Sequence, residues 1–137
     1  MPCMRVFPDA NFFVAAGLNP AGDYNEVLSK GQDEYVTSEH VLNEVSRNLE
    51  RLNRNPEPFI RQLRTFIKVT DSFDVLPLGL PLDGSGDRQA LAEAIGSECD
   101  LFITSDTDFA ALFGQHVKGV LVEKSAHYAR RILSAGA

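Results

Sequence analysis

The stretch that decides the fold runs from residue 86 to residue 109 and reads GDRQALAEAIGSECDLFITSDTDF. A helical pattern over 88–97 is followed by a short apolar run, LFIT, over 101–104, and then by two aspartates, Asp106 and Asp108. A run of about four apolar residues is too short for a buried helix and is typical of a buried strand. The stretch therefore predicts a helix leading into a buried strand that ends in acidic side chains.

Comparable strand patterns recur on both sides of this stretch, and helical patterns separate them. The predicted strands, which are all short runs rich in apolar residues, cover 4–8, 34–37, 73–76, 101–104 and 119–122. Strands that alternate with helices need crossover connections, which favour a mainly parallel sheet with helices on both faces. We therefore expect a single α/β domain over residues 1–137, a three-layer α/β/α sandwich around a sheet of about five strands.

The composition is that of an ordinary globular protein with an excess of acid. The 137 residues are 44% hydrophobic and 23% charged, and the formal net charge is -6. This net charge argues against passive capture of nucleic acid by a basic surface. Cys3 and Cys99 form no CxxC pair, and neither a secretory signal nor a membrane helix is recognisable, so we expect reduced thiols in a cytoplasmic protein.

Two helical patterns after the second predicted strand carry six of the thirteen basic residues. Their apolar faces consist of Val41, Leu42, Val45, Leu49 and Leu52 in the first, and of Phe59, Ile60, Leu63, Phe66 and Ile67 in the second. The opposite faces carry Arg47, Arg51 and Arg54, and then Arg61, Arg64 and Lys68. Residues 53–58, NRNPEP, separate the helices because two prolines suit a turn. Such faces are usually just solvated, but residues 47–68 carry six basic and two acidic residues, a local excess of positive charge.

Acidic residues follow the predicted strands in a way that brings them together. Asp9 comes directly after the first strand, and Asp106 follows the strand at 101–104 after one residue. The carboxyl ends of parallel strands open onto one edge of the sheet, where ligands bind. Glu44 lies about two turns into the helix after the second strand, and Asp87 precedes a helix. These acids, with Asp108 as a further one, are expected to meet in one cleft.

Clustered carboxylates repel one another, so their grouping needs a cation. Oxygen ligands of this kind select Mg²⁺ or Mn²⁺, and such an ion can polarise a phosphoryl oxygen and activate water for phosphodiester hydrolysis. Each acid also has a simpler interpretation. Asp87 and Asp106 suit helix caps, and Ser105 with Asp108 matches a capping box. Glu44 could pair with a neighbour on its own helix.

At these residues the sequence resembles the PIN-domain family of small α/β/α nucleases. The segment 5–16, RVFPDANFFVAA, looks like the family's opening strand with its first acid at Asp9, and 38–49, SEHVLNEVSRNL, looks like the helix that carries the family's glutamate at Glu44. The resemblance spans nearly the whole chain, and the order of the acids is more specific than any single block.

The stretch from 86 to 109 resembles the family's third block, with its acids at Asp87 and Asp106 and an additional one at Asp108. Thr104 or Ser105 matches the small hydroxyl residue that the family places beside the fourth acid, and Asn11 follows the first acid closely. Asp83 competes with Asp87 for the third position, and we prefer Asp87 because it directly precedes the helix RQALAEAI.

The resemblance implies an endoribonuclease that uses Mg²⁺ or Mn²⁺, with catalytic and metal-binding roles for Asp9, Glu44, Asp87 and Asp106. If metal-activated water attacks phosphorus in such a site, we expect products with 5′-phosphate and 3′-hydroxyl ends. Many small members are toxins that a partner antitoxin holds inactive, and such toxins are commonly homodimers. Part of the arginine stripe, Arg47, Arg51 and Arg54, is expected to guide RNA phosphates toward the site.

Two other interpretations stay open. One is a catalytically silent PIN-like module that binds RNA or protein, against which the presence of all four acids counts. The other is a phosphoryl-transfer domain of the haloacid dehalogenase or receiver type. The first of these usually has Asp-x-Asp after its first strand, where this chain has Asp9 and Asn11, and the second needs an acid pair and a late lysine that are not apparent here.

Overall fold

The computed structural model describes residues 3–70 and 85–135, with side chains described for 3–70 and 89–135. Its sheet has six strands in the order β3-β2-β1-β4-β6-β5, and every neighbouring pair is parallel except β5 and β6. The strands are β1 (Arg5–Pro8), β2 (Glu34–Ser38), β3 (Lys68–Thr70), β4 (Leu101–Thr104), β5 (His116–Val117) and β6 (Val120–Lys124). The predicted α/β class and mainly parallel sheet are confirmed, with six strands in place of about five.

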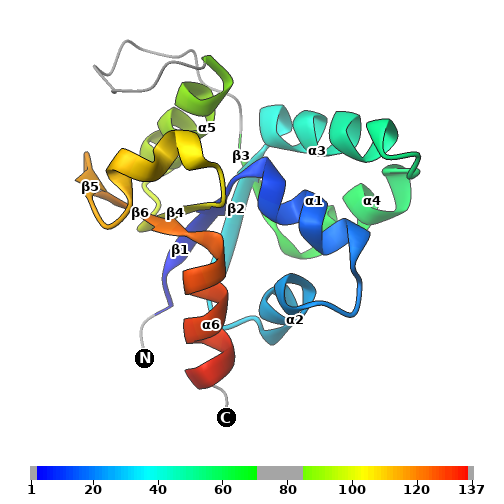
Figure 1. Ribbon diagram of the computed structural model, residues 1–137, viewed down its shortest axis with the longest axis horizontal. Helices are drawn as coiled ribbons and strands as arrows, with labels where there is room; N and C mark the ends of the chain where they lie inside the picture. Colours follow the sequence, from blue (N-terminus) through cyan, green and yellow to red (C-terminus); the bar gives the residue numbers. More distant parts are fainter. Residues whose placement is uncertain (1–2, 71–84, 136–137) are drawn as a thin grey trace.

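Helices cover both sides of this sheet, as the alternating pattern predicts. Figure 1 shows α1, α3 and α4 gathered on one side of the strands, with α5 on the other, where it contacts β2 and β4. The helices are α1 (Ala10–Leu18), α2 (Asp23–Lys30), α3 (Glu39–Arg51), α4 (Glu57–Phe66), α5 (Ser85–Gly96), α6 (Ser125–Ala135) and the 3-10 helix η1 (Thr107–Leu112). None of the helices in the described part of the chain is long and apolar enough to cross a membrane.

Strands β1 and β4 lie side by side at the centre and are each fully or nearly buried. The chain leaves β1 toward β2 and leaves β4 toward β6, so the direction of winding reverses between these two central strands. In parallel sheets this switch point opens a crevice beyond the carboxyl ends of the strands, and ligands bind there. The fold therefore places the ends of β1 and β4 where a site is expected.

The boundaries of the basic helices differ from the prediction. Helix α4 ends at Phe66 because Ile67 adopts an extended conformation, and Lys68 belongs to β3 instead of the helix. Helix α3 ends at Arg51, so Arg54 lies beyond it. Leu52, which the helical pattern assigns to the apolar face, is 51% exposed. The strand predicted at 73–76 lies outside the described residues.

Other departures concern elements without a strong apolar pattern. Helix α2 and strand β5 have no counterpart in the prediction, since α2 contributes only Val27 and Leu28 to the core and β5 has two residues. Both cysteines are free thiols, with Cys99 buried and Cys3 exposed. Burial raises the pKa of Cys99 to about 11. Cys99 therefore acts as a small core residue, as expected.

The core between the sheet and the helices depends on aromatic residues of the central strands. Phe102 in β4 is fully buried, with its ring centroid 6.2 Å from that of Phe7 in β1 and 5.2 Å from that of Phe109 in η1. It thus joins both central strands to the segment that follows β4.

We expect Phe102→Ala to lower the free energy of unfolding by about 3–5 kcal/mol, because it removes a fully buried ring and leaves a cavity. Phe66→Ala is the matched control, since Phe66 is 46% exposed, and a loss below about 1 kcal/mol is expected there. Urea denaturation checks both values. Equal losses in the two variants would contradict this view of the core.

Candidate active site

Asp9 is the residue around which the site is built. It follows β1 directly, caps the N-terminus of α1 and is only 7% exposed. Its Oδ1 accepts a hydrogen bond of 2.8 Å from the Ala10 amide, and its Oδ2 accepts one of 2.8 Å from the Thr104 hydroxyl at the end of β4. The Asp9 amide donates to the Ile103 carbonyl at 2.8 Å. Backbone and side chain together fix this carboxylate at the switch point between β1 and β4.

Burial has a clear electrostatic consequence for Asp9. Loss of hydration raises the pKa of its carboxyl group from 3.8 to about 6, although the hydrogen bonds from Thr104 and Ala10 oppose this change. The negative charges of Glu44 and Asp106 raise the pKa of Asp9 further. Glu44 and Asp106 are therefore each close enough to Asp9 to act on its charge. Within the described side chains, no lysine or arginine forms an ion pair with Asp9 or Asp106.

The hydroxyl of Thr104 connects the first and last acids. Besides donating to Asp9, it accepts a hydrogen bond of 3.1 Å from the Asp106 amide and one of 3.4 Å from the Asn11 side chain. Asn11 in turn accepts from the Ser105 amide at 3.4 Å. Thr104 is thus the hydroxyl residue in contact with the acids, whereas the Ser105 side chain is exposed. The two strand ends are held together by side chains as well as by the sheet.

Asp106 and Asp108 lie at the start of η1. Asp106 is the N-cap of this helix, and its Oδ1 accepts a hydrogen bond of 2.9 Å from the Asp108 amide. The cap is therefore Asp106, and the capping box suggested by Ser105 with Asp108 does not supply it. Asp106 is half-buried and Asp108 is exposed. Capping occupies one oxygen of Asp106 and leaves the other without a described partner, so the capping role does not exclude a ligand role.

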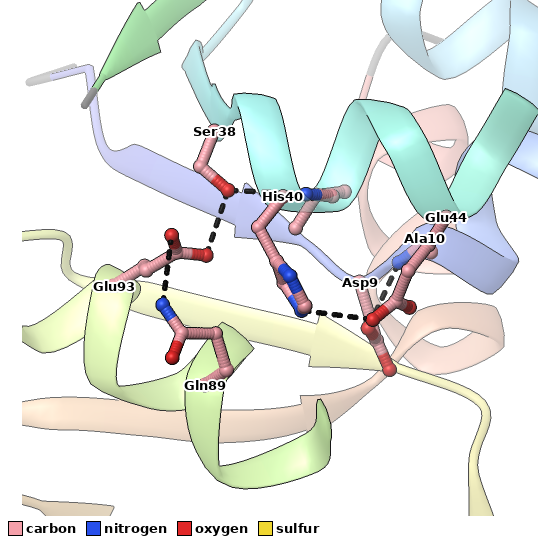
Figure 2. A network of polar contacts seen from close by, with 8 residues as sticks. Asp9, Ala10, Ser38, His40, Glu44, Gln89 and Glu93 are labelled. Carbon is pink, nitrogen blue, oxygen red and sulfur yellow. Dashed lines mark hydrogen bonds and ion pairs between the residues drawn. The ribbon is translucent and has the colours of Figure 1, made fainter. Parts of the chain in front are cut away.

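Glu44 reaches this region from α3, where it is paired with a histidine that sequence reasoning left without a role. His40 Nε2 lies 2.9 Å from Glu44 Oε1, one helical turn earlier. Figure 2 shows the two side chains beside Asp9. The spacing of four residues between His40 and Glu44 is the sequence signal that could have found this contact.

A second network of polar contacts joins α3 to α5 and was also missed. Ser38 is the N-cap of α3, accepting from the Val41 amide at 3.2 Å, and its hydroxyl donates to Glu93 Oε1 at 2.7 Å. Glu93 has no exposed surface and also accepts from Gln89 at 3.2 Å. Figure 2 shows this network next to His40 and Glu44. A glutamate within the apolar helix LAEAI is the available sequence signal for it.

The third predicted acid can be placed only in part. Asp87 lies in the first turn of α5, but its side chain is outside the described set, and Asp83 is outside the described residues altogether. Among the side chains of 3–70 and 89–135, no three from His, Cys, Asp and Glu are close enough to hold one metal ion. The donor chemistry of the site nevertheless fits Mg²⁺ or Mn²⁺, because no lysine or arginine among the described side chains pairs with its carboxylate oxygens.

The arginines of the two basic helices differ in how they are used. In α4, Arg61 is paired with Glu57 at 2.6 Å, and Arg64 holds both carboxylate oxygens of Glu39 at 2.7 and 2.8 Å. In the preceding segment, Arg51 contacts only the neutral side chain of Asn48, at 3.2 Å. Arg47 and Arg54 are exposed and form no ion pair with any described residue. Among the arginines of the two helical segments, those outside ion pairs with described residues therefore lie on and just after α3.

The chain has a mainly parallel α/β sheet with acids at its central switch point. This is the PIN-domain fold, as comparison with solved structures shows. Solved structures of this class superpose on most of the chain. VapBC2 from Rickettsia felis, bound to a DNA fragment from its promoter, gives a TM-score of 0.62 at 16% identity, covering 88% of this chain and 98% of its own.

Two further solved structures agree on the fold. VapC20 of Mycobacterium tuberculosis, a toxin that cleaves the sarcin-ricin loop, gives a TM-score of 0.58 at 21% identity, covering 77% of this chain and 93% of its own. PAE2754 of Pyrobaculum aerophilum gives 0.64 at 15% identity, covering 96% of this chain and 90% of its own. The sequence matches no model of a protein family and no curated protein. At these identities the likeness concerns the fold.

Replacing Asp9 by asparagine should stabilise the metal-free protein at neutral pH. A carboxyl group whose pKa rises from 3.8 to about 6 on folding costs nothing below pH 3.8, and its cost reaches about 3 kcal/mol above pH 6. We therefore expect Asp9→Asn to unfold at higher urea concentration than the wild type in EDTA at about pH 8, with the difference vanishing near about pH 4. Glu50→Gln controls for the change in net charge. A variant less stable than the wild type at both pH values would contradict the assignment.

Removing the Ser38 hydroxyl should destabilise the connection between α3 and α5. Ser38→Ala deletes the cap of α3 and leaves buried Glu93 with one donor fewer, so we expect a loss of about 1–3 kcal/mol. Ser29→Ala is the matched control, because the exposed Ser29 hydroxyl bonds only to the Asn25 carbonyl of its own helix. Thermal or urea unfolding measures both. Similar losses would remove Ser38 from this role.

Proposed function

We propose that the protein is an endoribonuclease that depends on Mg²⁺ or Mn²⁺ and hydrolyses RNA phosphodiester bonds. The observation that carries this proposal is the buried Asp9 carboxylate at the β1–β4 switch point, whose pKa is raised further by Glu44 and Asp106. A carboxylate with this burial and charge environment is costly to the fold, and such costs are typical of functional sites. The likeness to VapC20, a loop-cleaving toxin, supports the same class of activity.

The residues proposed to hold the ion are Asp9, Glu44, Asp87 and Asp106, with Asp108 as an additional acid. Mg²⁺ or Mn²⁺ bound there supplies polarisation of the phosphoryl oxygen and activation of a water nucleophile. The chain's own part is to hold Asp9 in place through the hydrogen bonds from Ala10 and Thr104. Each bond uses one lone pair of one carboxylate oxygen, so further lone pairs are left for an ion. Asn11 and Thr104 keep the two strand ends in register.

The choice of RNA as substrate is supported by the positive charge on α3. Arg47 and Arg51 lie on the helix that carries Glu44, and Arg54 follows it closely. Their guanidinium groups are not used in ion pairs within the described chain, unlike those of α4. These three arginines are proposed to contact RNA phosphates and to bring the backbone toward the acids.

The biological role we propose is the toxin of a type II toxin–antitoxin pair, acting in the cytoplasm as a homodimer. The support is the likeness of the chain to structures of VapBC complexes. A partner antitoxin would then hold the enzyme inactive. This part of the proposal is tested by co-purification with the product of the adjacent gene.

A catalytically silent module is the second candidate, and two observations favour it. Glu44 is engaged by His40, and the described acids do not bring three side chains within reach of one ion. Such a module would bind RNA without cutting it. The cleavage experiment that follows separates the two functions.

Purified protein should cut a structured RNA in the presence of Mn²⁺ or Mg²⁺ and leave it intact in EDTA. Asp9→Asn and Asp106→Asn should each reduce the rate by roughly a hundredfold or more, and Asp23→Asn, at an exposed position in α2, should not. End analysis should give 5′-phosphate and 3′-hydroxyl products, because activated water and not the 2′-hydroxyl attacks phosphorus, and the bond between phosphorus and the 3′ oxygen breaks.

Several outcomes would contradict the nuclease. Cyclic phosphate products would exclude direct attack by water, and full activity in EDTA would exclude dependence on a divalent metal. Calorimetry offers a separate check of the site, since unchanged Mn²⁺ affinity in both variants would overturn the assignment of Asp9 and Asp106. RNA that binds to the wild type but is never cut would establish the silent module.

A further inference from the structure

A shallow groove runs between α1 and α3 and leads away from the acids. Its volume is about 420 Å³, within the range of pockets that hold small ligands. The floor is apolar, and Leu52 at its far end is 51% exposed. The side chains that line the groove include Asn11, Val14 and Leu18 from α1, and Asn48, Arg51 and Leu52 from α3 and its C-cap.

The groove is continuous with the candidate site. Helix α1 begins at Asp9, and α3 carries Glu44, so both helices start near the acids and pack against each other. On α3, Asn48 and Leu52 follow Glu44 at intervals of four residues and share its face. Asn11 lines the groove and also bonds to Thr104, so it belongs to both.

The chemistry of the lining suits a nucleotide. Val14, Leu18 and Leu52 offer an apolar surface for the face of a base. Asn11 bonds to Thr104 and Ser105, and Asn48 to Arg51, but each amide has two donors and two lone pairs and so keeps capacity for a base edge. Arg51 supplies a positive charge whose described partner is the neutral Asn48. The apolar floor and the amides therefore match a base, and the guanidinium matches the phosphate attached to that nucleotide.

The spacing fits a nucleotide next to the cut. Arg51 lies seven residues after Glu44 in α3, which corresponds to about 10 Å along the helix axis. A phosphate on Arg51 is therefore not the phosphate at the acids but a neighbouring one. We propose that this groove is a subsite for one unstacked base of single-stranded RNA beside the scissile phosphate. The inference rests on the proposed function and adds to it a position at which the RNA sequence is read.

A binding experiment with abasic RNA tests the subsite. Fluorescence anisotropy measures the Kd of a short labelled oligoribonucleotide, with Ca²⁺ in place of Mg²⁺ to slow cleavage, for wild type and Leu52→Asn. An abasic nucleotide is moved in turn through the positions around the cut. We expect Leu52→Asn to raise the Kd of intact RNA about five- to tenfold. When the abasic nucleotide occupies the groove, Leu52→Asn should not change the Kd, so that the two changes form a double-mutant cycle.

Matched variants separate the groove from general effects. Phe66→Asn changes a similarly exposed apolar residue on α4, outside the groove, and should leave Kd unchanged. Arg51→Gln should reduce the slope of log K against log salt by about 0.7 to 1, because one phosphate contact is lost. Arg61→Gln, whose guanidinium is already paired with Glu57, should not.

The outcomes distinguish this inference from the proposed function. If the wild type cuts RNA but Leu52→Asn binds every RNA as the wild type does, the subsite is overturned and the nuclease stands. If Leu52→Asn weakens intact and abasic RNA equally at every position, Leu52 acts through packing, or the groove serves a peptide, and the subsite is also overturned. If an abasic nucleotide abolishes the effect of Leu52→Asn on Kd but no RNA is ever cut, the subsite stands and the proposed reaction fails.

Discussion

The burial of the Asp9 carboxylate is the constraint on which the rest of the site depends. An acid at the end of a central strand loses hydration, and its pKa rises to about 6 even though two hydrogen bonds favour the charged form. A hydrophobic fold gains nothing from this placement, because alanine or serine could end β1 without the cost. The surrounding residues can be understood as the means of keeping that charge in one position: Thr104 from β4, the amide of Ala10 and, through Thr104, Asn11.

The topology makes this position available. Asp9 and Thr104 are ninety-five residues apart, yet β1 and β4 are parallel neighbours, so their carboxyl ends coincide. Helices α3 and α5 arrive from opposite sides of the sheet, and Ser38 and Glu93 connect them by a buried hydrogen bond. Of the two hydrogen bonds that Glu93 accepts, the one from Ser38 crosses between the helices, and the one from Gln89 stays within α5. Loss of the Ser38 donor would leave a buried polar group short of a partner, which is costly.

Residue patterns predict the parts of this arrangement that depend on burial. The runs that form β1 and β4 are mostly apolar, with Arg5 and Thr104 at their ends, so the placement of Asp9 and Asp106 at the sheet edge follows from sequence. The contact of His40 with Glu44 does not follow, because helical spacing permits the pair without requiring it. Leu52 shows a second limit. Its apolar character fits the buried face of α3, but the helix ends one residue earlier, and the side chain is left in the groove.

Helix α3 carries opposite charges toward its two ends, and this polarity gives the net charge of the chain its meaning. Glu44 lies near the middle of the helix beside Asp9, whereas Arg51 ends the helix, about 10 Å further along its axis. The chain carries -6 overall. The arginines of α4 are paired with Glu57 and Glu39, whereas the arginines of α3 form no ion pair with a described residue. A polyanion is repelled by the acids unless a cation covers them, and it is attracted by the arginines beside them. In the proposed nuclease, binding of RNA and binding of a divalent cation would therefore be coupled by charge, each strengthening the other.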